Sequence, residues 1–394
     1  MHTTKPQEKP DLRQLGITER PPEHLLLAAL AFRSEDAATS QTALESLRAL
    51  VRAELEDELA PPESETGELG FQSNYDDYGL LVTVGISTSG YDRLGVPGER
   101  RPRDLQPMPP DMLDASGGGS GAQLAGEGDL LLKVCSNDVF VVEHVLRRVE
   151  HELASAFEVL WVQTGAQRYN TRQSDNPRHE SRALIGFLDG TSNLDPSQPG
   201  DRGLIFTDHA NATYPPIPTS DQYSGASFPG DLRLPPTEAE PVLLDGGTYL
   251  AVEVLLIKTP DWDAQSRAEQ ERSVGQDKQS GQRLPNAEPD SHVLKSNPGR
   301  PEDPPRRFLR RGYALVRPEG AALGRGLVFI AFGRTLSTQV EFVQRAWINN
   351  PNFPQNGAGR DLLLERFVQP RLLAGGFYFV PPLKKATQPW SWVI

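Results

Sequence analysis

The residues best suited to chemistry fall in three short stretches, and the first is LIGFLDGTSN at 184–193. Its aspartate, Asp189, stands between Gly186 and Gly190. Glycines allow a sharp turn or a close approach of the backbone, so a carboxylate between them is held in one direction. A carboxylate held in this way can transfer protons as a general acid and base. A simple turn, in which the aspartate bonds only its own backbone, explains the same pattern.

One position in this stretch excludes a different chemistry. The letters LDGT partly match the DxDGT signature of haloacid-dehalogenase-type phosphotransferases. Those enzymes need a nucleophilic aspartate at the first position of the signature, where this chain has Phe187. The nucleophile is missing, so Asp189 does not belong to such a site.

The second stretch, PDSHVLKSNPGRP, contains His292. The other histidines lie in the N-terminal tail, on a charged helix or in polar segments, and none has the spacing to carboxylates of a zinc or non-haem iron site. A lone histidine suits a cofactor that brings its other ligands with it. Haem is such a cofactor, because the porphyrin supplies four nitrogens and the protein adds one axial imidazole.

The third stretch is RRFLRRGYALVRP at 306–318. The strand period of two places Arg310 on one face, followed on that face by Gly312 and Ala314. These small residues leave room beside the guanidinium for a flat molecule. Arginines around an apolar strand also fit a plain basic edge of a sheet, and this alternative stays open.

The elements that must position these residues repeat one pattern in both halves of the chain. A run of apolar residues, a short polar break and then helical spacing occur at 129–157 and again at 326–348. Strands alternating with a few long helices in two similar halves predict a duplicated α+β domain, each half an antiparallel sheet with helices on one face. Further strands are expected at 24–32, 79–87, 158–164, 247–257, 308–317 and 375–381.

Composition and charge narrow the class of protein. A chain of 394 residues that is 37% hydrophobic can bury a large core. The formal net charge of −13 argues against a nucleic-acid or anionic-membrane partner, because no basic block offsets the acidic excess. The single cysteine, Cys135, excludes an internal disulfide and a cysteine-based zinc cluster, and its apolar context predicts a core thiol.

The N-terminal residues give an expectation about location. They are polar, with no twin arginine and no apolar signal region, and the first apolar run, at 24–32, is too short to span a bilayer. We therefore expect a cytoplasmic protein without a membrane segment, although a leader trimmed from the N-terminus would leave no trace.

Together the three stretches resemble the dye-decolourising (DyP-type) haem peroxidases. GFLDG fits that family's GxxDG motif, and Thr191 and Asn193 follow it as they usually do there. SHVLKSNP is similar to the family's proximal-histidine segment and FLRRGYAL to its distal-arginine segment. GxxDG alone is a weak pattern, whereas the three segments in this order, with apolar strands between them, are specific. Leu194 replaces the proline that often follows the asparagine, which leaves the subfamily open.

The resemblance implies a fold and a division of the chain. It implies two ferredoxin-like halves, arranged like a dimeric α+β barrel, with one haem b per chain between the sheet and the helices of the second half. The expected division is an N-terminal extension at 1–22, an N-terminal half at 23–175 and a C-terminal half at 176–394.

The resemblance also implies roles for single residues. His292 is expected to be the axial iron ligand, Asp189 the distal acid–base residue and Arg310 the distal guanidinium. Glu365 is expected to accept a hydrogen bond from the ligand histidine, with Asp361 as the second choice. The residues expected to line the haem are Gly186, Leu188, Gly190, Thr191 and Ser192, together with Leu327 and Phe329, which core packing explains equally well.

The implied activity is the oxidation of dyes, phenols and other aromatic small-molecule reductants by hydrogen peroxide. An aspartate base stays ionised in acid where a histidine base does not, so we expect an acidic optimum. A haem-binding or haem-iron-handling protein with little peroxidase turnover is the alternative. A third reading is a non-enzymatic scaffold in which His292 is only a loop residue. The oligomeric state and the physiological reductant are left open by the sequence.

Overall fold

The computed structural model describes most of the chain. The described ranges are 11–56, 79–109, 112, 126–167, 182–189, 192–211, 214–216, 218, 225–300, 304–319 and 322–394. Within them no helix is long and apolar enough to cross a membrane. The expected strands are all present, with two differences: the strand expected at 308–317 is interrupted at 311–312, and the one expected at 375–381 begins earlier, at Val368.

Nine antiparallel strands form one sheet in the order β5-β9-β2-β3-β1-β4-β7-β8-β6. An additional pairing between β5 and β8 joins its two ends, so the strands close around a common core. Strands β1, β3 and β5 are rich in aliphatic residues and are buried on both faces, whereas β4 alternates with exposed residues. The strands are β1 (His24–Phe32), β2 (Leu81–Ile86), β3 (Leu130–Ser136), β4 (Phe157–Ala166), β5 (Thr248–Ile257), β6 (Leu309–Arg310), β7 (Tyr313–Glu319), β8 (Ala322–Gly333) and β9 (Val368–Val380).

The two halves of the chain contribute four neighbouring strands each, if β6 and β7 are taken as one interrupted strand. The first half has the order β2-β3-β1-β4, and the second pairs β9 with β5, β5 with β8, and β8 with β7 and β6. If the first half is read from β4 to β2 and the second from β9 to β7, neighbouring strands are in both cases the fourth, first, third and second of that half along the chain. The α+β class is therefore confirmed, and the repeated strand order is the one expected of duplicated halves. The halves join where β2 pairs with β9 and where β4 pairs with β7.

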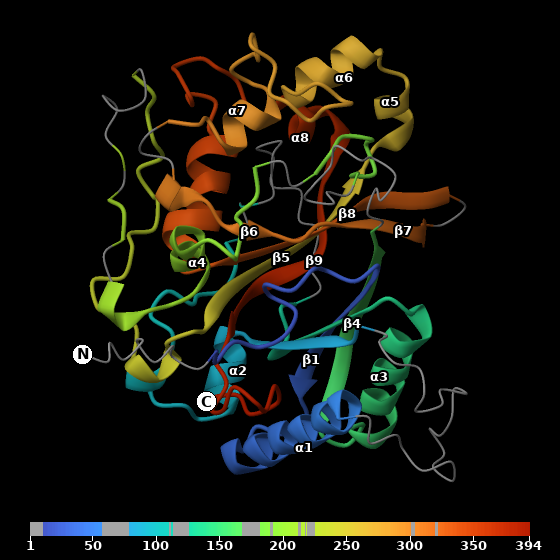
Figure 1. The fold of residues 1–394 in the computed structure, drawn as a ribbon, viewed down its shortest axis with the longest axis vertical. Helices are drawn as coiled ribbons and strands as arrows, with labels where there is room; N and C mark the ends of the chain where they lie inside the picture. Colours follow the sequence, from blue (N-terminus) through green and yellow to red (C-terminus); the bar gives the residue numbers. More distant parts are fainter. Residues whose placement is uncertain are drawn as a thin grey trace, which may run out of the picture.

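Helices cover the sheet on opposite sides (Figure 1). Those of the first half lie on one side of the strands, and α5 to α8 gather on the other. The helices are α1 (Ala37–Leu55), α2 (Thr88–Arg93), α3 (Val139–Glu152), α4 (Pro199–Ile205), α5 (Thr259–Asp263), α6 (Arg267–Val274), α7 (His292–Ser296) and α8 (Leu362–Phe367), with short 3₁₀ turns η1 (Gly98–Arg100), η3 (His209–Asn211), η5 (Val242–Leu244) and η6 (Pro304–Arg306).

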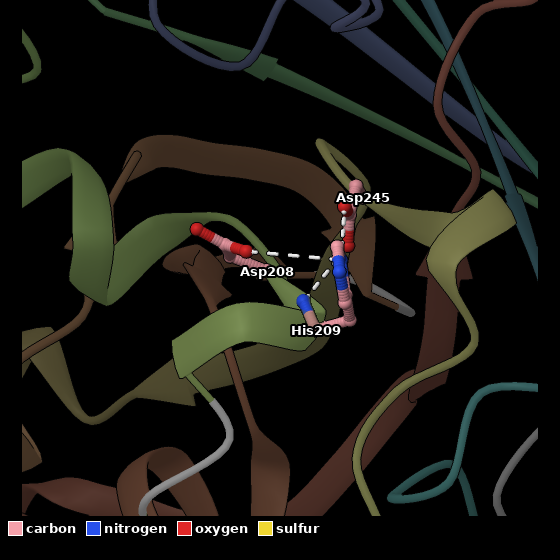
Figure 2. A group of neighbouring side chains, drawn as sticks. All are labelled: Asp208, His209 and Asp245. Atoms are coloured by element: carbon pink, nitrogen blue, oxygen red, sulfur yellow. Dashed lines mark hydrogen bonds and ion pairs between the residues drawn. The ribbon is translucent and has the colours of Figure 1, made fainter.

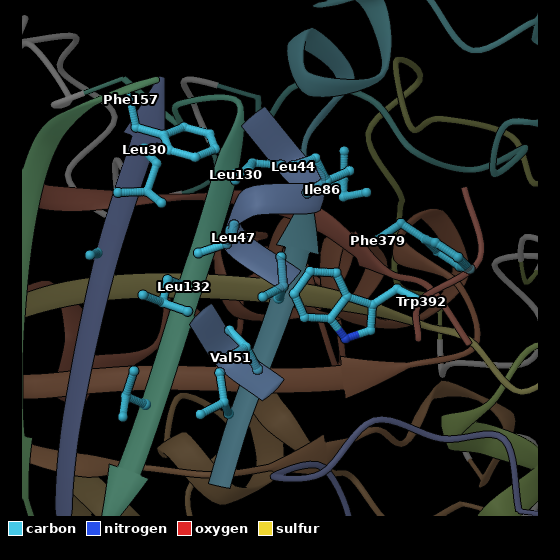
Figure 3. Close-up of a cluster of buried hydrophobic side chains, with 14 of the residues drawn as sticks. Leu30, Leu44, Leu47, Val51, Ile86, Leu130, Leu132, Phe157, Phe379 and Trp392 are labelled. Atoms are coloured by element: carbon cyan, nitrogen blue, oxygen red, sulfur yellow. The ribbon is translucent and has the colours of Figure 1, made fainter. Parts of the chain in front are cut away.

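The first half is held by packing of α1 against its strands. Asp36 begins the helix by accepting a hydrogen bond from the Thr39 backbone nitrogen, at 2.8 Å. Leu44, Leu47 and Val51 then project at helical spacing onto the strand residues below them (Figure 3). Trp392, from the C-terminal end of the chain, packs into the same cluster. The C-terminus therefore helps to close the core of the N-terminal half.

The predicted helix after β8 is present but differs in type. Its segments η7 (Leu336–Val340) and η8 (Val343–Ile348) are π-helical, with the wider i→i+5 hydrogen bonding, rather than α-helical. Such segments are often found at functional sites. This helix and α7 and α8 face the sheet of the second half, and the candidate site lies between these layers.

Candidate functional site

A cavity with two connected lobes lies between the second-half sheet and its helices. We call them the Arg182 lobe, of about 200 Å³, and the Glu253 lobe, of about 170 Å³. The side chains of Asp189, His292 and Arg310 line both lobes. The three residues singled out by the sequence therefore meet at the centre of one cavity. Leu327 also lines both lobes and Phe329 lines the Glu253 lobe, while their contact with haem stays a prediction.

His292 is the first residue of α7, and its ring is fixed by Asp361. The imidazole Nδ1 lies 2.7 Å from the Asp361 carboxylate Oδ2. This contact leaves Nε2 as the ring nitrogen available to a metal. Burial alone would lower the pKa of His292, but the charge and hydrogen bond of Asp361 outweigh it, so the pKa is raised. A carboxylate in this position makes a histidine ligand richer in electrons.

The identity of this carboxylate corrects one expectation. Glu365 is exposed on the outer side of α8, so its predicted hydrogen bond to the histidine is wrong. Asp361, the second choice, is only 1% exposed and is the N-cap of α8, where its Oδ1 accepts from the Leu364 backbone nitrogen at 3.1 Å. Asp361 is buried beside His292, whereas Glu365 lies on the exposed side of α8, away from Leu363 and Leu364, which line the cavity.

Asp189 lies at the end of a tight turn that its motif builds. The Gly186 nitrogen donates to the Ala183 carbonyl at 2.8 Å, and Gly186 has a φ of +87°, which favours glycine. Buried Phe187 and Leu188 anchor the segment, and Ser192 lines the Arg182 lobe. Of the other predicted motif residues, Gly190 and Thr191 lie outside the described residues.

The motif is tied directly to the arginine strand. The Asn193 side chain accepts a hydrogen bond from the Arg310 backbone nitrogen at 2.9 Å and donates one to the Arg310 carbonyl at 2.8 Å. The side-chain amide thus bonds both the N–H and the C=O of Arg310, as a residue on a neighbouring antiparallel strand would. It fixes the segment that carries Asp189 relative to the one that carries Arg310. The family pattern had pointed to Asn193, but not to this positioning contact.

Sequence reasoning missed a carboxylate in the cavity wall. Glu253, on β5, lines the lobe named after it and is 3% exposed. Gln344 donates to its Oε2 at 3.3 Å, and burial raises the pKa of Glu253 to about 7. The signal was visible in TYLAVEVLLI, where one acidic residue interrupts a strand that is otherwise apolar apart from its first two residues. Buried strands rarely contain an unpaired glutamate.

A second group of potential metal ligands lies on η3 and near η5 (Figure 2). The His209 Nδ1 is 2.5 Å from Asp245 Oδ2 and 4.0 Å from Asp208 Oδ1. The sequence did not predict this histidine and carboxylate cluster, because Asp245 is distant along the chain. Asp245 also accepts from the His209 backbone nitrogen at 2.8 Å. Asp245 therefore ties the segment after η5 to η3 through His209, and this structural contact explains why the three side chains lie together.

The lining of the main cavity fits a haem. It has one histidine supported by a buried carboxylate, mostly apolar walls, a space that extends to both sides of that histidine, and an acid and a guanidinium beside it. The fold and the site are therefore those of an α+β protein with a cavity suited to haem, in which His292 is the candidate ligand.

Comparisons with known proteins agree with this class. Family models described as Dyp-type peroxidase, N-terminal, and Dyp-type peroxidase, C-terminal, match residues 14–167 and 232–385. The chain belongs to the DyP-type peroxidase family, whose cofactor is haem. The boundaries at 22/23 and 175/176 stay predictions.

Curated relatives of this chain include deferrochelatases from two bacteria. The chain is 28% identical over 331 residues to a deferrochelatase of Shigella flexneri and 27% identical over 326 residues to that of Escherichia coli K12. These alignments cover 78% and 77% of this chain, and 67% and 65% of the relatives, so the match spans about two thirds of their length.

Two solved structures share the fold. A DyP-type peroxidase from Cellulomonas bogoriensis superposes with a TM-score of 0.68 at 23% identity, covering 97% of each chain. Ferric DtpA from Streptomyces lividans superposes with a TM-score of 0.70 at 20% identity, covering 95% of this chain and 92% of that one.

Proposed function

We propose that this protein is a haem peroxidase that uses hydrogen peroxide to oxidise dyes, phenols and similar one-electron donors. The observation that carries the proposal is the convergence of Asp189, Arg310 and His292 on one cavity, with His292 bonded to buried Asp361. A protein that only stored haem would need the histidine, but not an acid and a guanidinium beside it.

Each side chain has a role that its chemistry allows. His292 would hold the iron through Nε2, and Asp361 would keep its Nδ1 protonated. Bound haem supplies the redox-active iron that accepts and passes on electrons. Asp189 would take a proton from the peroxide oxygen nearer the iron and pass it to the more distant oxygen, which leaves as water. Arg310 would stabilise negative charge on the departing oxygen, because its guanidinium is a cation with several hydrogen-bond donors.

The direct test compares steady-state oxidation of a phenol and an anthraquinone dye by the haem-loaded wild type and by Asp189→Ala. We expect haem to bind normally and kcat to fall by about 10² to 10⁴, the usual contribution of a general acid–base group. Glu365→Gln is the matched control, because it removes an exposed carboxylate from the helix beside the site. Full activity in Asp189→Ala would refute the assigned role.

We also expect wild-type activity to be highest below neutral pH, because carboxylate bases stay ionised there.

Release of iron from haem is the second candidate function, favoured by the name of the curated relatives. It needs haem binding but not cleavage of peroxide. Incubation with haem and a reductant would then yield fluorescent iron-free protoporphyrin, and Asp189→Ala would retain this activity. If Asp189→Ala loses peroxidase turnover but still releases iron from haem, the two reactions use the same cavity and only the peroxidase reaction requires Asp189. An absence of protoporphyrin from both proteins would eliminate the second candidate.

A further inference from the structure

The two lobes of the haem cavity differ in charge. Arg182 gives its lobe a cation, accompanied by the amides of Gln276 and Asn297 and the hydroxyls of Ser192 and Ser296. The opposite lobe contains the Glu253 carboxylate among apolar side chains. The apolar residues of the Glu253 lobe include Met112, Phe308, Phe329, Val340, Val343 and Ile348. Asp189, Arg310 and His292 line both lobes and do not distinguish them.

Glu253 is poorly compensated for a buried acid. Among the described residues its Oε1 has no hydrogen-bond partner, and its Oε2 accepts only from the neutral Gln344 amide. No lysine or arginine of the described chain forms an ion pair with it. Its neighbours across β8 and β9 are Phe329 and Gly375, whose side chains offer no donor. Its charge is therefore directed at whatever occupies the lobe.

A disc centred on His292 must enter both lobes, because that residue lines both. One edge of the porphyrin then lies in the Arg182 lobe and the opposite edge lies in the Glu253 lobe. Protoporphyrin IX has two propionates on one edge and uncharged vinyl and methyl groups on the opposite edge. The charged edge of protoporphyrin IX therefore suits the Arg182 lobe, and its uncharged edge suits the Glu253 lobe.

We propose that Glu253 selects the porphyrin: it admits an uncharged edge, directs the propionates to the Arg182 lobe, and excludes porphyrins that carry carboxylates on both edges. Coproporphyrin III is such a molecule, since propionates replace the vinyl groups of protoporphyrin. In the cavity one of its carboxylates would meet the Glu253 carboxylate, with which no lysine or arginine of the described chain forms an ion pair. An uncompensated like charge is a common way in which a site rejects the wrong ligand. The apolar walls of this lobe favour vinyl and methyl groups in addition.

The test measures binding of ferric protoporphyrin IX and ferric coproporphyrin III to the haem-free full-length chain by Soret titration. We choose pH 8, where a pKa of about 7 leaves Glu253 mostly ionised. Wild type should bind the protoporphyrin complex at least about tenfold more tightly, and Glu253→Gln should reduce that ratio roughly fivefold or more by strengthening coproporphyrin binding. Glu365→Gln, which removes an exposed charge, should leave the ratio unchanged. Glu253→Leu should reduce the ratio in the same direction.

Two results would overturn the proposal. The first is equal binding of both porphyrins by wild type. The second is a ratio that stays the same in Glu253→Gln and Glu253→Leu. Failure of ferric protoporphyrin IX to bind wild type would refute the haem site itself and is distinguishable from both, because the comparison of the two porphyrins uses no peroxidase assay.

Discussion

The Asp189 carboxylate occupies the space that a side chain on Gly312 would need. Its Oδ2 lies 3.1 Å from the position of a Cβ added to Gly312, and Leu327 lies 3.3 Å from the same point. The glycine of the arginine strand is therefore part of the arrangement that positions the acid. The requirement links two motifs that are far apart in the sequence.

Gly312→Ala is expected to displace Asp189 without removing any functional group. At these distances Asp189 or Leu327 must move by a few tenths of an ångström. Because a misplacement of about 1 Å can cost about 10²-fold in rate, we expect kcat for dye oxidation to fall by roughly three- to tenfold while haem still binds. Steady-state kinetics and a Soret titration measure the two quantities. Gly98→Ala is the control, because no atom lies within 4 Å of its added Cβ. Equal activity in both variants would show that the close approach has no effect.

Asn193→Ala is expected to loosen Arg310, because it removes both hydrogen bonds between the side chain and that backbone. We expect kcat to fall by about the same order as in Arg310→Ala, roughly 10²-fold, with haem content retained. A double-mutant cycle measures the coupling: if Asn193 acts through Arg310, the double variant is little worse than Arg310→Ala alone. Additive losses would mean that the amide has a separate role.

Asp361→Asn is expected to weaken haem binding, because the amide cannot accept the His292 proton as a carboxylate does. Loss of such a partner typically costs 10- to 100-fold in affinity for the metal. We expect a Kd for ferric protoporphyrin IX about tenfold higher or more, together with a changed Soret spectrum. An amide can still accept from the Leu364 nitrogen, so the start of α8 is preserved. Glu365→Gln should bind haem like wild type, and an equal effect in both variants would contradict the assignment of Asp361.

Much of the site could be predicted from the sequence because its motifs are local. Asp189 between glycines and Arg310 beside small residues are patterns of a few positions, and strand periodicity assigns their faces. The strands were predicted equally well, because long apolar runs bounded by turns have few other solutions.

What sequence reasoning missed depends on contacts between distant segments. The choice of Asp361 over Glu365 is decided by how α8 packs beside His292, which buries the N-cap and leaves Glu365 exposed, and helix periodicity alone does not reveal it. The Asn193 contact with the Arg310 backbone is likewise a tertiary contact. The π-helical form of 336–348 also differs from the prediction, because its apolar spacing fits an ordinary helix equally well.

Glu253→Gln is expected to stabilise the haem-free protein at high pH. Burial raises the pKa of Glu253 from its ordinary value of 4.5 to about 7, so ionisation of the carboxyl is costlier in the folded chain than in the unfolded one. The resulting destabilisation is absent below pH 4.5, grows between pH 4.5 and 7, and is complete above the folded-state pKa.

Urea unfolding of both proteins at pH 5 and pH 8 tests this. The stability of Glu253→Gln relative to wild type should rise by about 2 to 3 kcal/mol between the two pH values. Glu240, whose pKa burial also raises to about 7, is present in both proteins, so its contribution cancels in the comparison. Glu365→Gln should show no such rise. A difference between Glu253→Gln and wild type that is the same at both pH values would mean that Glu253 ionises normally in the folded chain, and its charge could then not be the uncompensated one that the porphyrin meets.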